Sequence, residues 1–145
     1  MLCAHTLAEA LKELGPEALA AKLNWPLPDR NPDDPRSWIH QHITTVYQET
    51  DQSGSVTREA AKALSAFIGA EHYEVEVQGI VDDYLRRAET LVGRALDWKK
   101  DDTALQNIQA RTRAPMVWLL ANIKGFLLLA TSNRSEIAVG YATMD

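Results

Sequence analysis

An uninterrupted apolar run late in the chain, Phe126-Leu127-Leu128-Leu129-Ala130, constrains the fold more than any other feature of the sequence. Gly125 precedes this run, and the polar residues Thr131-Ser132-Asn133 follow it. A short run that is apolar on both faces and bounded by turn residues is typical of a central parallel strand with helices on each side. The run therefore predicts an α/β fold.

The rest of the chain alternates between helical and extended patterns. Apolar spacing predicts helices over 2–14 and 16–23, a helix that follows the turn at 51–55 and ends at Gly69, a longer helix from about Ile80, and a helix over about 103–123 that Pro115 kinks or restarts. Short strands are expected at 43–47 and 72–77, because these segments are rich in β-branched and aromatic residues or alternate strictly. This alternation predicts a layered α/β fold with a parallel sheet and right-handed crossovers.

Residues 24–36 break the pattern, because four of the six prolines lie there. Such a segment predicts a surface loop without regular structure. A partner-binding loop is one interpretation. An insertion is favoured, because long loops cost little free energy.

Composition limits the classes of partner and the compartment. The 145 residues suit a single domain, and the formal net charge of -5 argues against a generic nucleic-acid binder. Anionic small molecules remain compatible with this charge, since backbone N–H groups and local cations can bind a phosphate. Only one cysteine is present, and we find neither a secretory signal nor an apolar span long enough for a bilayer. We therefore expect a cytoplasmic protein with no membrane partner and no nucleic-acid partner.

Two places fit a ligand site, because ligands of open α/β sheets bind at the carboxyl ends of strands. One is the Ser53-Gly54-Ser55 turn, where Ser55 or Thr57 could cap the next helix. The other follows the apolar run, where Thr131 offers a hydroxyl and Glu136 a carboxylate that could bind Mg²⁺ beside a phosphate. The residues alone leave open a simple capping box at Glu136.

A third candidate is the segment 106–113. Asn107 and Arg111 are four residues apart, so they share one face of the predicted helix. An amide and a guanidinium together can bind a carboxylate, a ribose or a phosphate. The alternative is a solvated helix face with no ligand.

Other chemically active residues give weaker signals. His40 and His42 would point the same way on an extended segment, but no third metal ligand stands at a suitable spacing. Cys3 is expected to be a buried structural thiol. Trp118, Leu119 and Leu120 are expected in the core.

Two segments together resemble the NAD synthetase family, and the similarity is greater to its bacterial glutamine-dependent form. The first segment is Gln106-Asn107-Ile108-Gln109-Ala110-Arg111-Thr112-Arg113, and the second runs from Phe126 to Tyr141. The stretch from Ser53 to Gly69 is also similar to the segment after that family's second strand. The resemblance covers roughly residues 40–145, and it is the pair of motifs that makes it specific.

The resemblance implies a partial doubly wound parallel sheet of the ATP-pyrophosphatase (adenine nucleotide alpha hydrolase-like) type. It implies a ligase that uses ATP and Mg²⁺ to form an adenylate of deamido-NAD, which ammonia converts to NAD. By position, Asn107 and Arg111 would contact deamido-NAD, and Thr131 would contact ATP. Glu136 would bind Mg²⁺ or approach the deamido-NAD site. No catalytic side chain is assigned. Ammonia would come from a glutaminase domain outside this chain, and the full enzyme would be a homo-oligomer.

The sequence also departs from the family's pattern. The Ser-Gly-Gly-x-Asp-Ser pyrophosphate loop is absent, the chain stops before further ligand-binding segments, and Gln106 stands where many relatives carry an acidic residue. We therefore expect residues 1–145 to be a single partial synthetase domain that is inactive in isolation. Two alternatives stay open. One is a non-catalytic remnant that binds a nucleotide or a partner, and the other is a tRNA-thiolating or GMP-forming enzyme of the same fold type.

Overall fold

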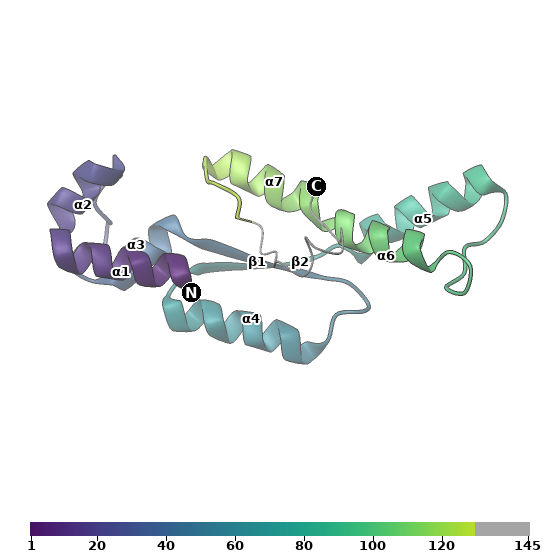
Figure 1. The fold of residues 1–145 in the computed structure, drawn as a ribbon, viewed down its shortest axis with the longest axis horizontal. Helices are drawn as coiled ribbons and strands as arrows, with labels where there is room; N and C mark the ends of the chain where they lie inside the picture. The colour runs from purple at the N-terminus through teal and green to yellow at the C-terminus, as the bar shows by residue number, and fades with distance from the viewer. Residues whose placement is uncertain (130–145) are drawn as a thin grey trace. The chain divides into compact units, whose positions relative to one another are not determined.

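The computed structural model describes residues 1–129 and divides the chain into two compact units. The first unit consists of Met1–Tyr47 and Ser53–Val75, and the second of Gln48–Gln52 and Glu76–Asp145. Figure 1 labels the helices and strands in chain order. Each unit is described in turn.

The first unit opens with α1 (Leu2–Leu14) and α2 (Pro16–Leu23), as the sequence predicts. Gly15 separates them with a left-handed φ of 75°, and Pro16 starts α2 at a position where its missing N–H costs nothing. Leu11, Leu19 and Trp38 form the buried core of this helical part. Burial of these side chains, rather than helix propensity, therefore fixes α1 and α2.

An unpredicted helix follows, α3 (Pro35–His42). Asp34 caps it, because its Oδ1 accepts a hydrogen bond of 2.9 Å from the Arg36 backbone N–H. The proline-rich segment lacks helix and strand over residues 24–34 only. The Trp38 indole N–H donates to the Pro32 carbonyl at 2.7 Å and so fastens this segment to α3.

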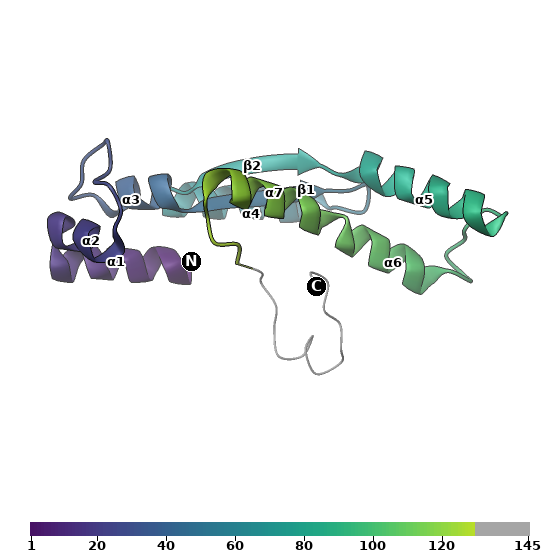
Figure 2. The same ribbon diagram turned by 90° about the horizontal axis from the view of Figure 1, so that it is seen from above.

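The sheet consists of β1 (Thr44–Glu49) and β2 (Glu71–Glu76), and it contains no other strand among residues 1–129. The Glu71 N–H donates to the Ile43 carbonyl, and the Val77 N–H donates to the Glu49 carbonyl. Both residue numbers rise together from one bond to the next, so the two strands are parallel. Figure 2 shows them side by side. The prediction of an α/β chain with a parallel sheet is confirmed at this level.

Helix α4 (Ser55–Ile68) joins the two strands. Its buried Ser65 hydroxyl lies 2.6 Å from Thr45 Oγ1, and Thr45 Oγ1 lies 2.8 Å from His72 Nδ1. This network connects α4 with both strands and fixes their register. The helix ends at Gly69 as predicted, but Gly54 is its N-cap, with no side-chain cap from Ser55 or Thr57.

The second unit contains α5 (Gln78–Val92), α6 (Asp102–Arg111) and α7 (Arg113–Lys124). The predicted restart near Pro115 is confirmed, because α6 ends at Arg111 and α7 begins two residues later. Proline has no N–H for the Arg111 carbonyl. The buried Thr112 marks the break, and its hydroxyl donates to the Ile108 carbonyl at 2.7 Å.

Three sequence predictions about burial and strand structure are wrong. Residues 126–129 form no strand, and Leu127 is 84% exposed. A strand buried on both faces needs neighbouring strands for its backbone groups, and β1 and β2 make up the whole described sheet. Trp118 and Leu119 are more than half exposed, and Cys3 is exposed too. Within residues 1–129, no helix is both long and apolar enough to cross a membrane.

Candidate functional site

The carboxyl ends of β1 and β2 lie at one edge of the sheet, because the two strands are parallel. The Asp51 backbone N–H, after β1, donates to Gln78 Oε1, after β2, at 3.1 Å. Thr50 is buried beside this bond, with 3% of its surface exposed. The edge is therefore an ordered surface of polar groups, the place where α/β sheets bind ligands.

The first turn of α5 at this edge is occupied by the chain itself. Glu76 Oε1 accepts hydrogen bonds from the backbone N–H groups of Gln78 and Gly79, the second at 3.2 Å. The Gln78 side-chain amide donates to Asp82 Oδ1 at 2.7 Å. Because a carboxylate already satisfies these free N–H groups, the start of α5 does not offer an anion site.

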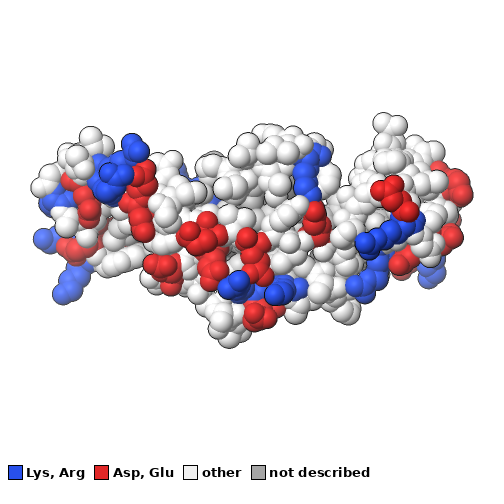
Figure 3. All heavy atoms as spheres, turned by 180° about the vertical axis from the view of Figure 1, so that it is seen from behind, with Lys and Arg blue, Asp and Glu red and all other residues white. Residues whose placement is uncertain are grey.

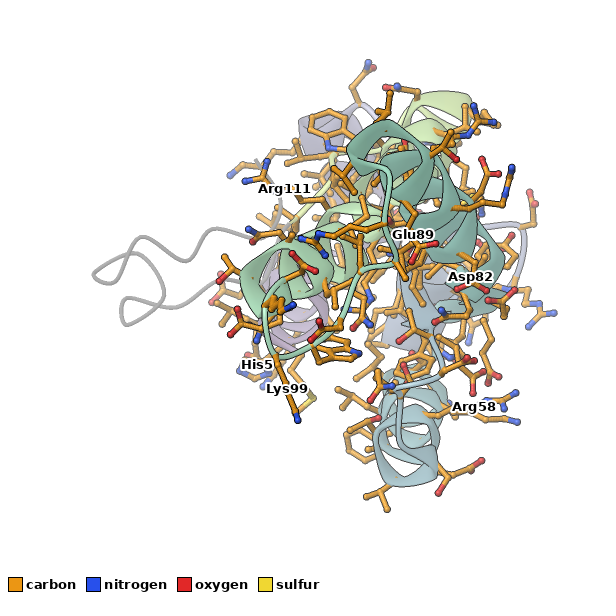
Figure 4. The ribbon with its side chains drawn as sticks, turned by 90° about the vertical axis from the view of Figure 1, so that its right-hand side faces the viewer. His5, Arg58, Asp82, Glu89, Lys99 and Arg111 are labelled. Carbon is orange, nitrogen blue, oxygen red and sulfur yellow. The ribbon has the colours of Figure 1, made fainter. Side chains whose placement is uncertain are left out.

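Asn107 and Arg111 lie on α6 and are both exposed. Leu105 is buried, so α6 packs by another part of its surface. Among residues 1–129, neither side chain has a hydrogen bond or an ion pair with another residue. Figure 4 shows Arg111 at the surface, on the opposite side of the view from Asp82 of α5. Both groups are available to a ligand, and their role in binding deamido-NAD remains a prediction.

Arg113, the first residue of α7, is a functional candidate that the sequence analysis did not single out. Its guanidinium donates a long hydrogen bond of 3.5 Å to Thr50 Oγ1 at the carboxyl end of β1. These two residues are 63 positions apart in the chain. The motif 106–113 contains Arg113, but only the tertiary structure brings it to the strand end.

Thr131 and Glu136, the predicted ATP and Mg²⁺ contacts, lie outside the described residues. Residues 1–129 contain no group of three or more His, Cys, Asp or Glu side chains that could bind a metal ion. The two histidines that the sequence placed on an extended segment, His40 and His42, lie on α3 instead. Two positions apart on a helix, they do not share a face.

His42 instead takes part in an aromatic cluster. Its ring stacks on Trp25 with 3.9 Å between centroids and 15° between planes. Its Nε2 is buried and has no hydrogen-bond partner. Burial lowers the pKa of His42 below its ordinary value, because the imidazolium form loses hydration.

Charged side chains of both signs are interspersed on the face drawn in Figure 3. On α5, Asp83 pairs with Arg87 at 2.7 Å and with Arg86. The hydrogen bonds from Arg87 and then Arg86 hold the pKa of Asp83 below its usual value. In the connector after α5, Arg94 binds Asp101 through two bonds of 2.7 Å. On α5 and in the connector after it, these acidic side chains are thus paired with neighbouring arginines.

Comparison with known proteins gives a consistent result. The chain is 35% identical to a glutamine-dependent NAD(+) synthetase of Oryza sativa subsp. indica over 126 residues, which is 77% of this chain and 17% of the rice protein. It is 34% identical to the enzyme of the same name from Aquifex aeolicus over 104 residues, 72% of this chain and 18% of that protein. The chain therefore spans about a fifth of the length of these curated relatives.

A solved structure is also similar to this chain. A glutamine-dependent NAD(+) synthetase from Cytophaga hutchinsonii matches 98% of this chain and 26% of its own, with a TM-score of 0.90 and 43% identity. The family model described as NAD synthase matches residues 38–144. This match includes β1, β2, the exposed pair on α6 and the Arg113 contact with Thr50, and the chain belongs to the NAD synthase family.

Proposed function

We propose that this chain is part of a glutamine-dependent NAD⁺ synthetase that amidates deamido-NAD with ATP. The nicotinate carboxylate attacks the α-phosphate of ATP, so that pyrophosphate leaves and an adenylate forms. Ammonia then displaces AMP and leaves the amide of NAD. Family membership supports the reaction, and the single structural observation behind our site is the exposed, unpaired Asn107 and Arg111 on α6.

Different residues of the proposed site bind the two substrates, deamido-NAD and ATP. Asn107 and Arg111 bind deamido-NAD, because an amide and a planar guanidinium together match its phosphate, ribose and carboxylate groups. Thr131 contacts ATP and Glu136 binds Mg²⁺, as the resemblance implies. ATP and Mg²⁺ supply the leaving pyrophosphate and its charge neutralisation. Ammonia comes from a glutaminase domain outside this chain, in a cytoplasmic homo-oligomer with an ATP-pyrophosphatase-type fold.

The purified 145-residue chain should form no NAD, since the family's pyrophosphate loop is absent from its sequence. NAD formation by this chain alone would contradict that proposal. The first measurement is the intact mass of the native protein, which is captured from its own cells with an antibody to this segment. A mass several times 16.2 kDa supports a full synthetase, and a mass of 16.2 kDa favours the non-catalytic remnant instead.

The site is tested in the native protein by Asn107→Ala and Arg111→Ala. Each change removes a hydrogen bond to a charged group, so kcat/KM for deamido-NAD should fall by about 10- to 100-fold. The KM for ATP should stay unchanged. Gln106→Ala is the matched control, because Gln106 is an exposed neighbour on the same helix. Equal activity of all three variants would remove Asn107 and Arg111 from the site.

A further inference from the structure

The arginines among residues 1–129 differ in burial and in ion pairing. Arg113 is partly buried, whereas every other arginine among residues 1–129 is exposed. Four of the exposed arginines pair with a carboxylate, and these are Arg58, Arg86, Arg87 and Arg94. Arg113 has no acidic partner among residues 1–129, and its side chain makes only the long hydrogen bond to Thr50.

This distribution runs against the usual cost of burying charge. A cation loses hydration when it is buried, so a buried arginine needs an anion more than an exposed one does. The guanidinium of Arg113 has five N–H donors, and Thr50 accepts from one nitrogen only. The remaining donors at the carboxyl end of β1 are available to an anionic ligand.

The neighbouring groups leave this role to Arg113. Glu76 Oε1 accepts hydrogen bonds from the backbone N–H groups in the first turn of α5. The Gln78 side chain accepts a hydrogen bond from the Asp51 N–H and donates one to Asp82. These polar groups order the edge but leave Arg113 as the cation there that lacks an acidic partner among residues 1–129. A planar guanidinium fork matches the oxygens of a phosphate through paired hydrogen bonds.

We infer that Arg113 binds a phosphate group of a nucleotide substrate at the carboxyl end of β1, with Thr50 orienting its guanidinium. This inference rests on the proposed function, which supplies two sources of that phosphate. One is the triphosphate of ATP, and the other is the pyrophosphate of deamido-NAD. The role is separate from that of Arg111, which is exposed on α6 and does not make the Thr50 contact.

The test measures binding of ATP, deamido-NAD and inorganic pyrophosphate to the native protein by calorimetry, each ligand alone. Arg113→Gln should weaken the binding of one of the two nucleotides by about 10- to 100-fold and leave the binding of the other unchanged. A loss of affinity for ATP and pyrophosphate would mean that Arg113 binds the triphosphate of ATP. A loss of affinity for deamido-NAD would mean that Arg113 binds the pyrophosphate of the dinucleotide. Arg113→Lys should restore part of the affinity, because it keeps the charge without the fork. Arg87→Gln, an exposed arginine on α5, is the control and should change nothing.

Two results would overturn the inference. Unchanged affinity of Arg113→Gln for all three ligands would mean that no phosphate contacts Arg113. An equal loss for both nucleotides that Arg113→Lys does not restore would indicate a disturbed sheet edge instead of a lost contact. If the unsubstituted protein binds neither nucleotide, the proposed function itself fails, so the two failures are distinguishable.

Discussion

Gly69, which ends α4, is the position where a small substitution should have the best-defined cost. Its φ of 83° is left-handed, and a Cβ there would lie 3.2 Å from Arg36 Nε and 3.4 Å from Arg36 Cβ. Arg36 cannot withdraw freely, because its guanidinium donates to the Ala66 carbonyl at 2.9 Å. Gly69→Ala therefore imposes backbone strain and displaces Arg36.

The two contributions can be estimated separately. A left-handed alanine costs about 1 kcal/mol, and pushing Arg36 off its rotamer adds about 1 kcal/mol. Gly93 ends α5 at a similar φ of 71°, but among residues 1–129 no atom beyond its two chain neighbours lies within 4 Å of a Cβ there. Gly93→Ala should therefore cost about 1 kcal/mol, and Gly69→Ala about 2 kcal/mol.

Native-state amide hydrogen exchange measures these costs helix by helix, which suits two glycines in different units. The free energy of opening of the last turn of α4 is compared with that of α5. In an Arg36→Ala background, Gly69→Ala should cost only about 1 kcal/mol, because the displaced side chain is gone. Equal costs for the two glycines, or an unchanged cost for Gly69→Ala in that background, would refute the reasoning.

Two further predictions concern the first unit. Leu19 is 2% exposed in the core with Leu11 and Trp38, so Leu19→Ala should lower the free energy of unfolding by about 3 kcal/mol. The control Leu2→Ala, at a 78% exposed position, should change this free energy by less than about 0.5 kcal/mol. Urea unfolding followed by tryptophan fluorescence measures both values, and similar losses in the two variants would contradict this core. Because burial lowers the pKa of His42, the unfolded chain takes up its proton first as the pH falls below 6.5, and stability should drop with it. The urea unfolding midpoints at about pH 8 and about pH 5 should differ less in His42→Phe than in the parent protein. The control His40→Asn, at an exposed position, should keep the parent's difference. A His42→Phe variant with the parent's pH dependence would show that His42 does not cause the loss of stability at low pH.

Local chemistry in the sequence was enough to predict several elements. Gly15 and Pro16 mark the boundary between α1 and α2, because one adopts a left-handed φ and the other begins a helix. Pro115 predicts the break before α7, since it cannot donate to the carboxyl end of α6. Helix α3 was missed although Asp34 and Pro35 are a known start signal, because the prolines around them suggested a loop.

The sequence by itself determined where α1 and α2 begin and end, where α4 ends, that the sheet is parallel, and which motif carries the exposed pair Asn107 and Arg111. The tertiary structure decided burial and proximity. Leu127 is exposed because an apolar run becomes a buried strand only when neighbouring strands cover it. Arg113 lies beside Thr50, 63 residues away, because the packing of the second unit places the start of α7 next to the residue that follows β1. A residue's spacing along the chain is a local property, whereas the groups that surround it depend on long-range packing.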